Sequence, residues 1–402
     1  MSEAYIIDAI RTPIGKLRGA LSPIRADDLA AMPIKELLNR NPNIDPERIE
    51  DVIYGCANQA GEDNRNVARM ASLLAGLPIS VPGETVNRLC ASGMSSTVRA
   101  YHAIKVGEGD LFVTGGMEHM TRGPMVLGKG SAPYSGTNEM HDSTFGWRFV
   151  NPKMDEMYGS EGMGQTAENI VEQFDIGRED QDKFAAWSQQ KAAKATENGR
   201  LSKEIMPVEI PRRKQDPLIF EKDEFIRPDT TVEVLSNLPA VFREGGTVTP
   251  GNASGLNDGA GALLVAGDQA IKDFDLEPKA KIVASAVVGV EPRIMGMGPV
   301  DATHKVMKRT GLSLDDMDVI ELNEAFAAQS LAVLRELDID DDDERVNPNG
   351  GAIALGHPLG MTGARLLQTA MVELHEKEGS KYALCTLCVG VGQGMSVILE
   401  KV

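Results

Sequence analysis

Short apolar runs alternate with longer amphipathic stretches along most of the chain. The short runs are rich in β-branched residues and predict strands at 5–7, 51–54, 111–114, 319–322, 383–387 and 396–399. Apolar residues at helical spacing predict helices at 26–38, 95–106, 325–337 and 363–376. Strand–helix alternation of this kind is typical of an α/β fold with mainly buried sheets.

The middle of the chain has a different pattern. Glycines, prolines and a basic loop, Arg212-Arg213-Lys214, accompany helical patterns at 166–174 and 179–197. We interpret this segment as an inserted domain. The predicted organisation is a first half of 1–120 and 252–275, an insert of 121–251, and a second half of 276–402.

Two matches at one offset indicate that the halves are duplicates. Cys90-x-x-Gly-Met-Ser superimposes on His357-x-x-Gly-Met-Thr after a shift of 267 residues. The same shift superimposes Asp51-Val52-Ile53 on Asp318-Val319-Ile320. Equivalent places in the two halves would therefore supply a thiol and an imidazole. A nucleophile and a base paired in this way predict an enzyme.

Composition limits the classes of partner. The 402 residues carry a formal net charge of −18, with 42% hydrophobic residues. This is an ordinary globular composition, and its acidity argues against nonspecific binding to nucleic acid or anionic membranes. An anionic small ligand would need a local group of basic residues. The chain shows no signal peptide, no membrane-length apolar run and no peroxisomal address, so we expect a cytoplasmic protein.

The four cysteines, at 56, 90, 385 and 388, do not form a disulfide framework. Cys385-x-x-Cys388 could be a redox pair or half of a zinc site. Cys385 lies within a strand pattern, however, and no second pair of ligands exists. The acidic run 338–344 lacks the glycine and the spacing of a calcium loop. We predict no metal site.

Cys90 and His357 are the main candidates for chemistry. Cys90 precedes a predicted helix, whose N-terminus would favour a thiolate, although a buried structural cysteine is the alternative. His357 lies among glycines and before a proline, in a constrained loop. A histidine with a pKa near neutrality suits deprotonation of a thiol, whereas a lone histidine is usually only hydrogen-bonded.

Two further residues follow predicted strands. Cys388 opens the glycine-rich turn 388–394, whose backbone amides could face a developing oxyanion. The turn does not have the dinucleotide-binding spacing. Asn323 could be a helix N-cap, or its amide could hold a water in a pocket, and the two roles do not exclude each other.

The blocks around Cys90, Asn323, His357 and Cys388 together resemble the thiolase family, in order and in spacing. The resemblance extends from Ala9 to the last predicted strand. It implies two βαβαβαββ halves in a five-layer αβαβα sandwich, an α/β fold with an inserted loop domain.

The same resemblance implies roles for these residues. Cys90 would carry the acyl group, His357 would activate Cys90 and the CoA thiol, and Cys388 would protonate the acetyl-CoA enolate. Asn323 would hold a water that forms one oxyanion hole with His357, and the amides of Cys90 and Gly390 would form the other. Positions that match the family's CoA and pocket contacts are Ser254, Arg227, Met163 and Phe326. Coenzyme A would be a substrate, with no permanently bound cofactor.

The leading functional prediction is an acetyl-CoA C-acyltransferase, a 3-ketoacyl-CoA thiolase of fatty acid β-oxidation. The alternatives are an acetyl-CoA acetyltransferase, a 3-oxoadipyl-CoA thiolase, and a catalytically silent acyl-CoA-binding scaffold. Gly390-Val391-Gly392 and the absence of a histidine just before Met163 point away from the acetoacetyl-forming subgroup. The stretches 55–66, 146–152 and 289–293 resemble the degradative and oxoadipyl-type branch.

The resemblance also implies association. We expect a homodimer or homotetramer, with residues 123–146 as a candidate tetramer arm. A hydratase–dehydrogenase of β-oxidation is a further possible partner.

Overall fold

The structure, a computed structural model, describes residues 2–130, 132–134, 136 and 139–402. Its main sheet runs in the order β12-β13-β14-β11-β1-β10-β5-β3-β4, with β2 beside β10. Parallel pairing joins β3 to β4 and β5, and β12 to β13, and the other pairs are antiparallel. The strands are β1 (Ala4–Arg11), β2 (Gly15–Lys16), β3 (Asp51–Gly55), β4 (Gly83–Val86), β5 (Leu111–His119), β10 (Asn257–Gly267), β11 (Ala280–Gly289), β12 (Val319–Leu322), β13 (Tyr382–Val389) and β14 (Gln393–Lys401).

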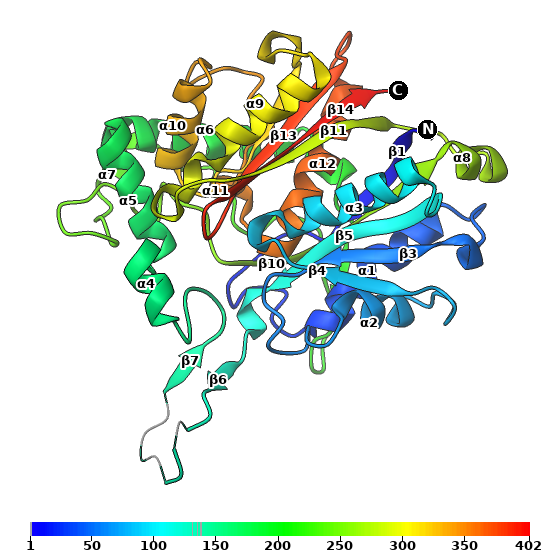
Figure 1. Cartoon of the computed structure of the whole chain (residues 1–402), viewed down its shortest axis with the longest axis horizontal. Helices are drawn as coiled ribbons and strands as arrows, with labels where there is room; N and C mark the ends of the chain where they lie inside the picture. Colours follow the sequence, from blue (N-terminus) through cyan, green and yellow to red (C-terminus); the bar gives the residue numbers. More distant parts are fainter. Residues whose placement is uncertain (1, 131, 135, 137–138) are drawn as a thin grey trace.

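Helices form three layers around the two halves of this sheet (Figure 1). The apolar side chains of α1 and α2 pack on one face of the first-half strands. The middle layer is α3 and α12, which contact each other between the halves. On the far side, α9 and α10 cover the second-half strands, which confirms the predicted five-layer α/β fold. These helices are α1 (Ala26–Arg40), α2 (Val67–Leu74), α3 (Ser92–Val106), α9 (Gly298–Thr310), α10 (Ala327–Glu336) and α12 (Leu359–Glu376).

The duplication is visible in how each half enters its middle helix. In the first half, β3 pairs in parallel with β4, and the chain then passes Cys90 into α3. In the second half, β12 makes a parallel bridge from Ile320 to Val346, and the chain passes His357 into α12. Cys90 and His357 each lie two residues before their helix. The offset found in the sequence thus corresponds to one structural position used twice.

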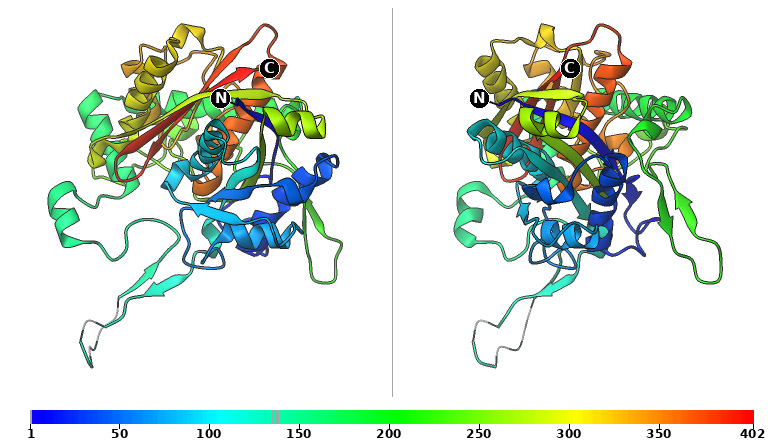
Figure 2. Two further views of the ribbon diagram at one scale, coloured as in Figure 1. Left: turned by 45° about the vertical axis from the view of Figure 1, so that its right-hand side comes forward. Right: turned by 90° about the vertical axis from the view of Figure 1, so that its right-hand side faces the viewer.

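The segment between β5 and β10 carries the structure inserted in the first half. A hairpin of β6 and β7 extends away from the body of the molecule (Figures 1 and 2). Helices α4 to α7 and the hairpin of β8 and β9 follow it. Their bounds are β6 (Met125–Leu127), β7 (Met140–Asp142), α4 (Pro152–Tyr158), α5 (Met163–Phe174), α6 (Arg178–Glu197), β8 (Val208–Ile210), β9 (Leu218–Phe220) and α7 (Val232–Ser236). The short helices α8 (Asp268–Phe274) and α11 (Ala352–Leu355) lie outside this segment.

The sequence pattern located the predicted elements but shortened several of them. Helix α12 begins at Leu359 rather than at 363, because Gly360 and Gly363 obscure the helical pattern of its first turn. Strand β10, in which alanine and glycine dominate much of the length, and strand β11 were not predicted. Among the described residues, no helix has the length and hydrophobicity needed to cross a membrane.

Candidate active site

Cys90 lies in a short 3₁₀ turn, Leu89–Ala91, that leads directly into α3. Leu89 has a left-handed φ of 45°, which turns the chain sharply before the half-buried cysteine. Burial raises the pKa of the thiol to about 11, although the backbone N–H groups of Gly390 and Cys90 act in the opposite direction. The expectation of a favoured thiolate at the helix N-terminus is therefore wrong for the resting site, because loss of solvation outweighs the amides.

His357 is buried and held from two sides. Its backbone N–H donates to Asn257 Oδ1 at 3.0 Å, and its Nδ1 lies 2.7 Å from Thr362 Oγ1. The Thr362 hydroxyl donates to the Pro358 carbonyl at 2.8 Å, so it accepts from Nδ1–H. This network leaves the lone pair on Nε2.

The protonation equilibrium of His357 differs from the expectation of a near-neutral pKa. Burial, followed by the charge of Arg365, lowers the pKa of His357 to about 3. The imidazole of His357 is therefore neutral near pH 7, as is the thiol of Cys90. Its role as a base must depend on what the bound substrate does to the thiol.

Asn323 follows β12 and faces the imidazole. Its Nδ2 lies 3.4 Å from His357 Nε2, and its Oδ1 is buried with no hydrogen-bond partner in the described residues. The helix cap interpretation is wrong, because α10 begins at Ala327 with Phe326 as its N-cap. A buried amide with free hydrogen-bonding capacity beside Nε2 suits a site for a polar ligand.

Cys388 lies near the end of β13, just before the turn to β14. It is buried, and burial together with the neighbouring Cys90 raises its thiol pKa well above the usual value. Val391 and Gly392 make the turn with φ values of 62° and 79°. Cys385 and Cys388 are three residues apart in one strand, so their side chains point to opposite faces. This geometry excludes the redox-pair interpretation.

Glu118 was missed in the sequence analysis. It is the second-to-last residue of β5 and is buried, and it accepts hydrogen bonds from the backbone N–H groups of Ala57 at 3.0 Å, Asn58 at 2.9 Å and Gly360 at 2.8 Å. Gly360 belongs to the second half, three residues after His357. Burial raises the pKa of Glu118 to about 7. One carboxyl group thus joins the loops of both halves, and an acidic residue inside an apolar strand was the available signal.

The predicted pocket residues Met163 and Phe326 surround Cys388. Met163 begins α5, and it packs against a cluster of buried residues that contains Phe326 and Cys388. Ser254 donates its backbone N–H to the Ala325 carbonyl at 3.0 Å, which brings it beside the Asn323 loop. The sulfur of Cys388 therefore has an apolar environment on the insert side of the site.

Arg227 lies in a separate cavity of about 430 Å³ formed by the insert together with Ile353 of α11. Its guanidinium lies 5.4 Å from the centre of the Phe225 ring, and Pro250 and Gly251 complete one wall. From Gly251 in this wall, the chain continues directly to Ser254. A long ligand could thus extend from this cavity toward the thiols.

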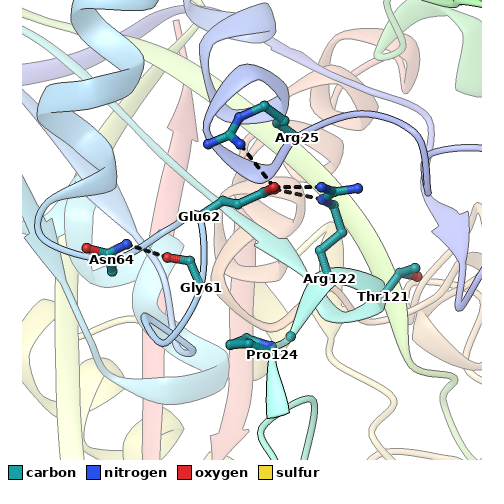
Figure 3. A pocket seen from close by; sticks show the side chains of 8 residues that line it. Arg25, Gly61, Glu62, Asn64, Thr121, Arg122 and Pro124 are labelled. Atoms are coloured by element: carbon teal, nitrogen blue, oxygen red, sulfur yellow. Dashed lines mark hydrogen bonds and ion pairs between the residues drawn. The ribbon is translucent and has the colours of Figure 1, made fainter. Parts of the chain in front are cut away.

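A larger surface pocket of about 630 Å³ lies elsewhere and contains none of the predicted catalytic residues. Figure 3 shows Glu62 between the guanidinium groups of Arg25 and Arg122. The hydrogen bond from Arg122 is the main cause that lowers the pKa of Glu62 to about 2. Because both arginines share this carboxylate, we do not assign the pocket to the reaction.

Known families match nearly the whole chain. Residues 4–269 match the thiolase N-terminal domain, and residues 276–401 match the thiolase C-terminal domain. The chain belongs to the thiolase family. It is therefore an acyltransferase family member, as the resemblance of the four sequence blocks implied.

Several curated thiolases are similar to this thiolase over their full length. It is 60% identical to the 3-oxoadipyl-CoA/3-oxo-5,6-dehydrosuberyl-CoA thiolase of Escherichia coli strain K12, over 100% of both chains. It is 56% identical to a β-ketoadipyl-CoA thiolase of Acinetobacter baylyi, again over 100% of both chains. The resemblance to the oxoadipyl-type branch is thereby confirmed.

Solved structures of thiolases share the fold. The Bacillus anthracis acetyl-CoA acetyltransferase is 39% identical, with a TM-score of 0.93 over 100% of this chain and 99% of that one. Human mitochondrial 3-ketoacyl-CoA thiolase in complex with CoA is also 39% identical, with a TM-score of 0.92 over 100% and 98% of the two chains.

Proposed function

We propose that this thiolase cleaves 3-oxoadipyl-CoA with CoA to give acetyl-CoA and succinyl-CoA. The reaction class is supported by the convergence of Cys90, His357, Asn323 and Cys388 on one site. The substrate is supported by full-length relatives that carry this name at 60% identity. The names of these relatives favour the 3-oxoadipyl-CoA thiolase over the general 3-ketoacyl-CoA thiolase that the sequence analysis preferred. They likewise favour a role in aromatic degradation over a role in fatty acid β-oxidation.

In the first half-reaction, Cys90 Sγ attacks the C3 carbonyl and its proton passes to His357 Nε2. The resulting oxyanion accepts hydrogen bonds from the backbone amides of Cys90 and Gly390, and the enolate oxygen that forms when the C2–C3 bond breaks accepts them from protonated Nε2 and from a water on Asn323. The C2–C3 bond then breaks, and the C2 carbanion takes the proton of Cys388 to form acetyl-CoA. The remaining four-carbon acyl group stays on Cys90 as a thioester.

The second half-reaction returns every group to its starting state. His357 first gives its proton to the Cys388 thiolate and then takes a proton from the incoming CoA thiol. The CoA sulfur attacks the thioester, whose oxyanion accepts from the amides of Cys90 and Gly390. Collapse releases succinyl-CoA, and His357 reprotonates Cys90.

The neutral resting state of the site is compatible with this sequence. A thiol with a pKa of about 11 and an imidazole with a pKa of about 3 remain uncharged until a substrate oxygen can take the developing charge. Coenzyme A would lie along the cavity of Arg227 and Ser254, with Met163 and Phe326 near the reacting carbons. No permanently bound cofactor is needed for any step.

The exposed apolar side chains on the β6–β7 hairpin support the proposed self-association. Met125, Leu127 and Met140 are each more than half exposed there. Burying them against a second copy would remove this apolar surface from water. We retain a homodimer or homotetramer, and a cytoplasmic location, as proposals.

The proposal is tested by measuring CoA-dependent cleavage of acetoacetyl-, 3-oxohexanoyl-, 3-oxopalmitoyl- and 3-oxoadipyl-CoA. We expect the highest kcat/KM for 3-oxoadipyl-CoA, and no cleavage by Cys90→Ser, which should still bind CoA. A higher kcat/KM for one of the substrates with an uncharged acyl chain would refute 3-oxoadipyl-CoA as the preferred substrate. A folded, CoA-binding wild type that cleaves none of the four would instead favour the silent scaffold.

A further inference from the structure

The proposed substrate presents an electrostatic requirement that the catalytic residues do not meet. After the first half-reaction, Cys90 carries an acyl chain that ends in a carboxylate. With carbon–carbon bonds of about 1.5 Å, this carboxylate lies within about 6 Å of the sulfur. The protein has a net charge of −18, so its average field repels this group. A local cation on the acyl side of the site must compensate.

Several other arginines already have well-formed hydrogen bonds or ion pairs. Arg293 pairs with Glu161 at 2.8 Å, and Arg122 and Arg25, in the surface pocket away from the catalytic residues, share Glu62. Arg88, in the Cys90 loop, donates to Ser95 and Gln393 at 2.8 and 3.0 Å, so two neutral partners fix its guanidinium. These contacts leave few donors for a substrate.

Arg148 is different. It is half-buried in the loop between β7 and α4, and its guanidinium makes two long contacts, 3.3 Å to Asn58 Oδ1 and 3.5 Å to the Ser143 carbonyl. Among the residues that the structure describes, no carboxylate lies within ion-pair distance of it. The N–H donors of Arg148 thus make only long hydrogen bonds, and both acceptors are neutral oxygens.

The contacts of Arg148 connect it to both catalytic loops. Asn58 is fixed by donating to the Ser143 carbonyl at 2.9 Å and to Glu118 at 2.9 Å. Glu118 also holds Gly360, just after His357. The preceding residue, Ala57, accepts from the Asn87 side chain at 2.9 Å, just before Cys90. Since β3 and β4 are parallel neighbours, the loop of Asn58 and the loop of Cys90 leave the same edge of the sheet.

We propose that Arg148 determines specificity by binding the distal carboxylate of a dicarboxylic acyl chain. This inference rests on the proposed function, since only a substrate with that second carboxylate needs it. A guanidinium offers two parallel N–H donors to a carboxylate, a geometry that a lysine cannot reproduce. On binding, the Arg148 guanidinium would give up its two long contacts with neutral oxygens and form an ion pair with the distal carboxylate of the acyl chain.

The test compares two substrates that differ mainly in charge. The selectivity is the ratio of kcat/KM for 3-oxoadipyl-CoA to that for 3-oxohexanoyl-CoA, which has the same chain length without the carboxylate. Arg148→Gln should lower this ratio by about 10²-fold, because the distal carboxylate would lose its charged partner. Arg148→Lys should give an intermediate ratio. The matched control is Lys153→Gln, which removes an exposed cation of the same segment and should keep the wild-type ratio.

A second route neutralises Arg148 without removing it. Asn58→Asp would place a carboxylate within about 3.3 Å of the guanidinium and should lower the ratio in the same direction. If Arg148→Gln and Asn58→Asp both keep the wild-type ratio and unfold at the wild-type temperature, the inference about Arg148 is overturned. The proposed function would still stand. A wild-type enzyme with no preference for 3-oxoadipyl-CoA would overturn the proposed function and the inference with it.

Discussion

The two halves of this thiolase use one structural position for opposite purposes. In the first half, the residue two positions before the middle helix is Cys90, which is half-buried and reachable by a substrate. In the second half it is His357, which is buried and fixed by the hydrogen bonds that it donates to Asn257 and Thr362. The duplication therefore determines the position of each reactive group, and local packing determines its exposure and orientation. A nucleophile must be approached, whereas a base needs only a fixed orientation.

The largest expected effect tests whether the two halves act as one unit. Cys90→Ser and His357→Ala should each lower kcat/KM by at least about 10⁴-fold, because neither group can perform its step without the other. The double variant should then be no worse than the poorer single variant. Steady-state kinetics on purified proteins would measure this, with CoA binding as the control for folding. Losses that multiply would show that the halves contribute independently.

Removing the amide that faces His357 should have the next largest effect. Asn323→Ala should lower kcat by about 10²–10³-fold, the usual loss for one oxyanion donor. KM should change little, because the amide acts on a charge that appears only during the reaction. The matched control is Asn64→Ala, an exposed amide outside the proposed mechanism. A fall in kcat of less than about tenfold would remove Asn323 from the proposed oxyanion hole.

Glu118 allows a test of the link between the halves through stability. Its pKa is raised to about 7 by burial, whereas an exposed glutamate titrates near 4.5. The folded state therefore binds this proton more tightly. The stabilising contribution of this proton is complete below about pH 4.5 and is lost as the pH rises through 7. The loss could reach about 3 kcal/mol in the free energy of unfolding.

Glu118→Gln should abolish this pH dependence. The difference in unfolding free energy between variant and wild type should shift in favour of the variant between pH 5 and 8. Denaturant titrations of both proteins at four pH values would measure it. A difference that stays constant over this range would mean that Glu118 does not carry the proton.

The sequence predicted the positions of the reactive groups but not their environments. The offset between Cys90 and His357 located both helix entrances, and the strand before Asn323 was predicted at its observed bounds. The raised pKa of Cys90 and the lowered pKa of His357 were not predicted, because desolvation depends on neighbours from other parts of the chain. Glu118 was missed for the same reason. Its partners are backbone amides of Ala57, Asn58 and Gly360, which no side-chain pattern reveals.

The smallest predicted effect concerns the tautomer of His357. Thr362 accepts Nδ1–H only because its own hydroxyl proton is donated to Pro358. Thr362→Val removes that acceptor, so the tautomer with the proton on Nε2 becomes populated and cannot take the Cys90 proton. We expect kcat to fall about tenfold, as for other residues that orient a histidine. Thr362→Ser keeps the hydroxyl and should restore most of the rate. NMR of ¹⁵N-labelled histidine would show the Nδ1–H signal in wild type and Thr362→Ser and its loss in Thr362→Val. An unchanged tautomer with a slower reaction would mean that Thr362 acts through packing, and the imidazole would then be oriented by its backbone contact with Asn257.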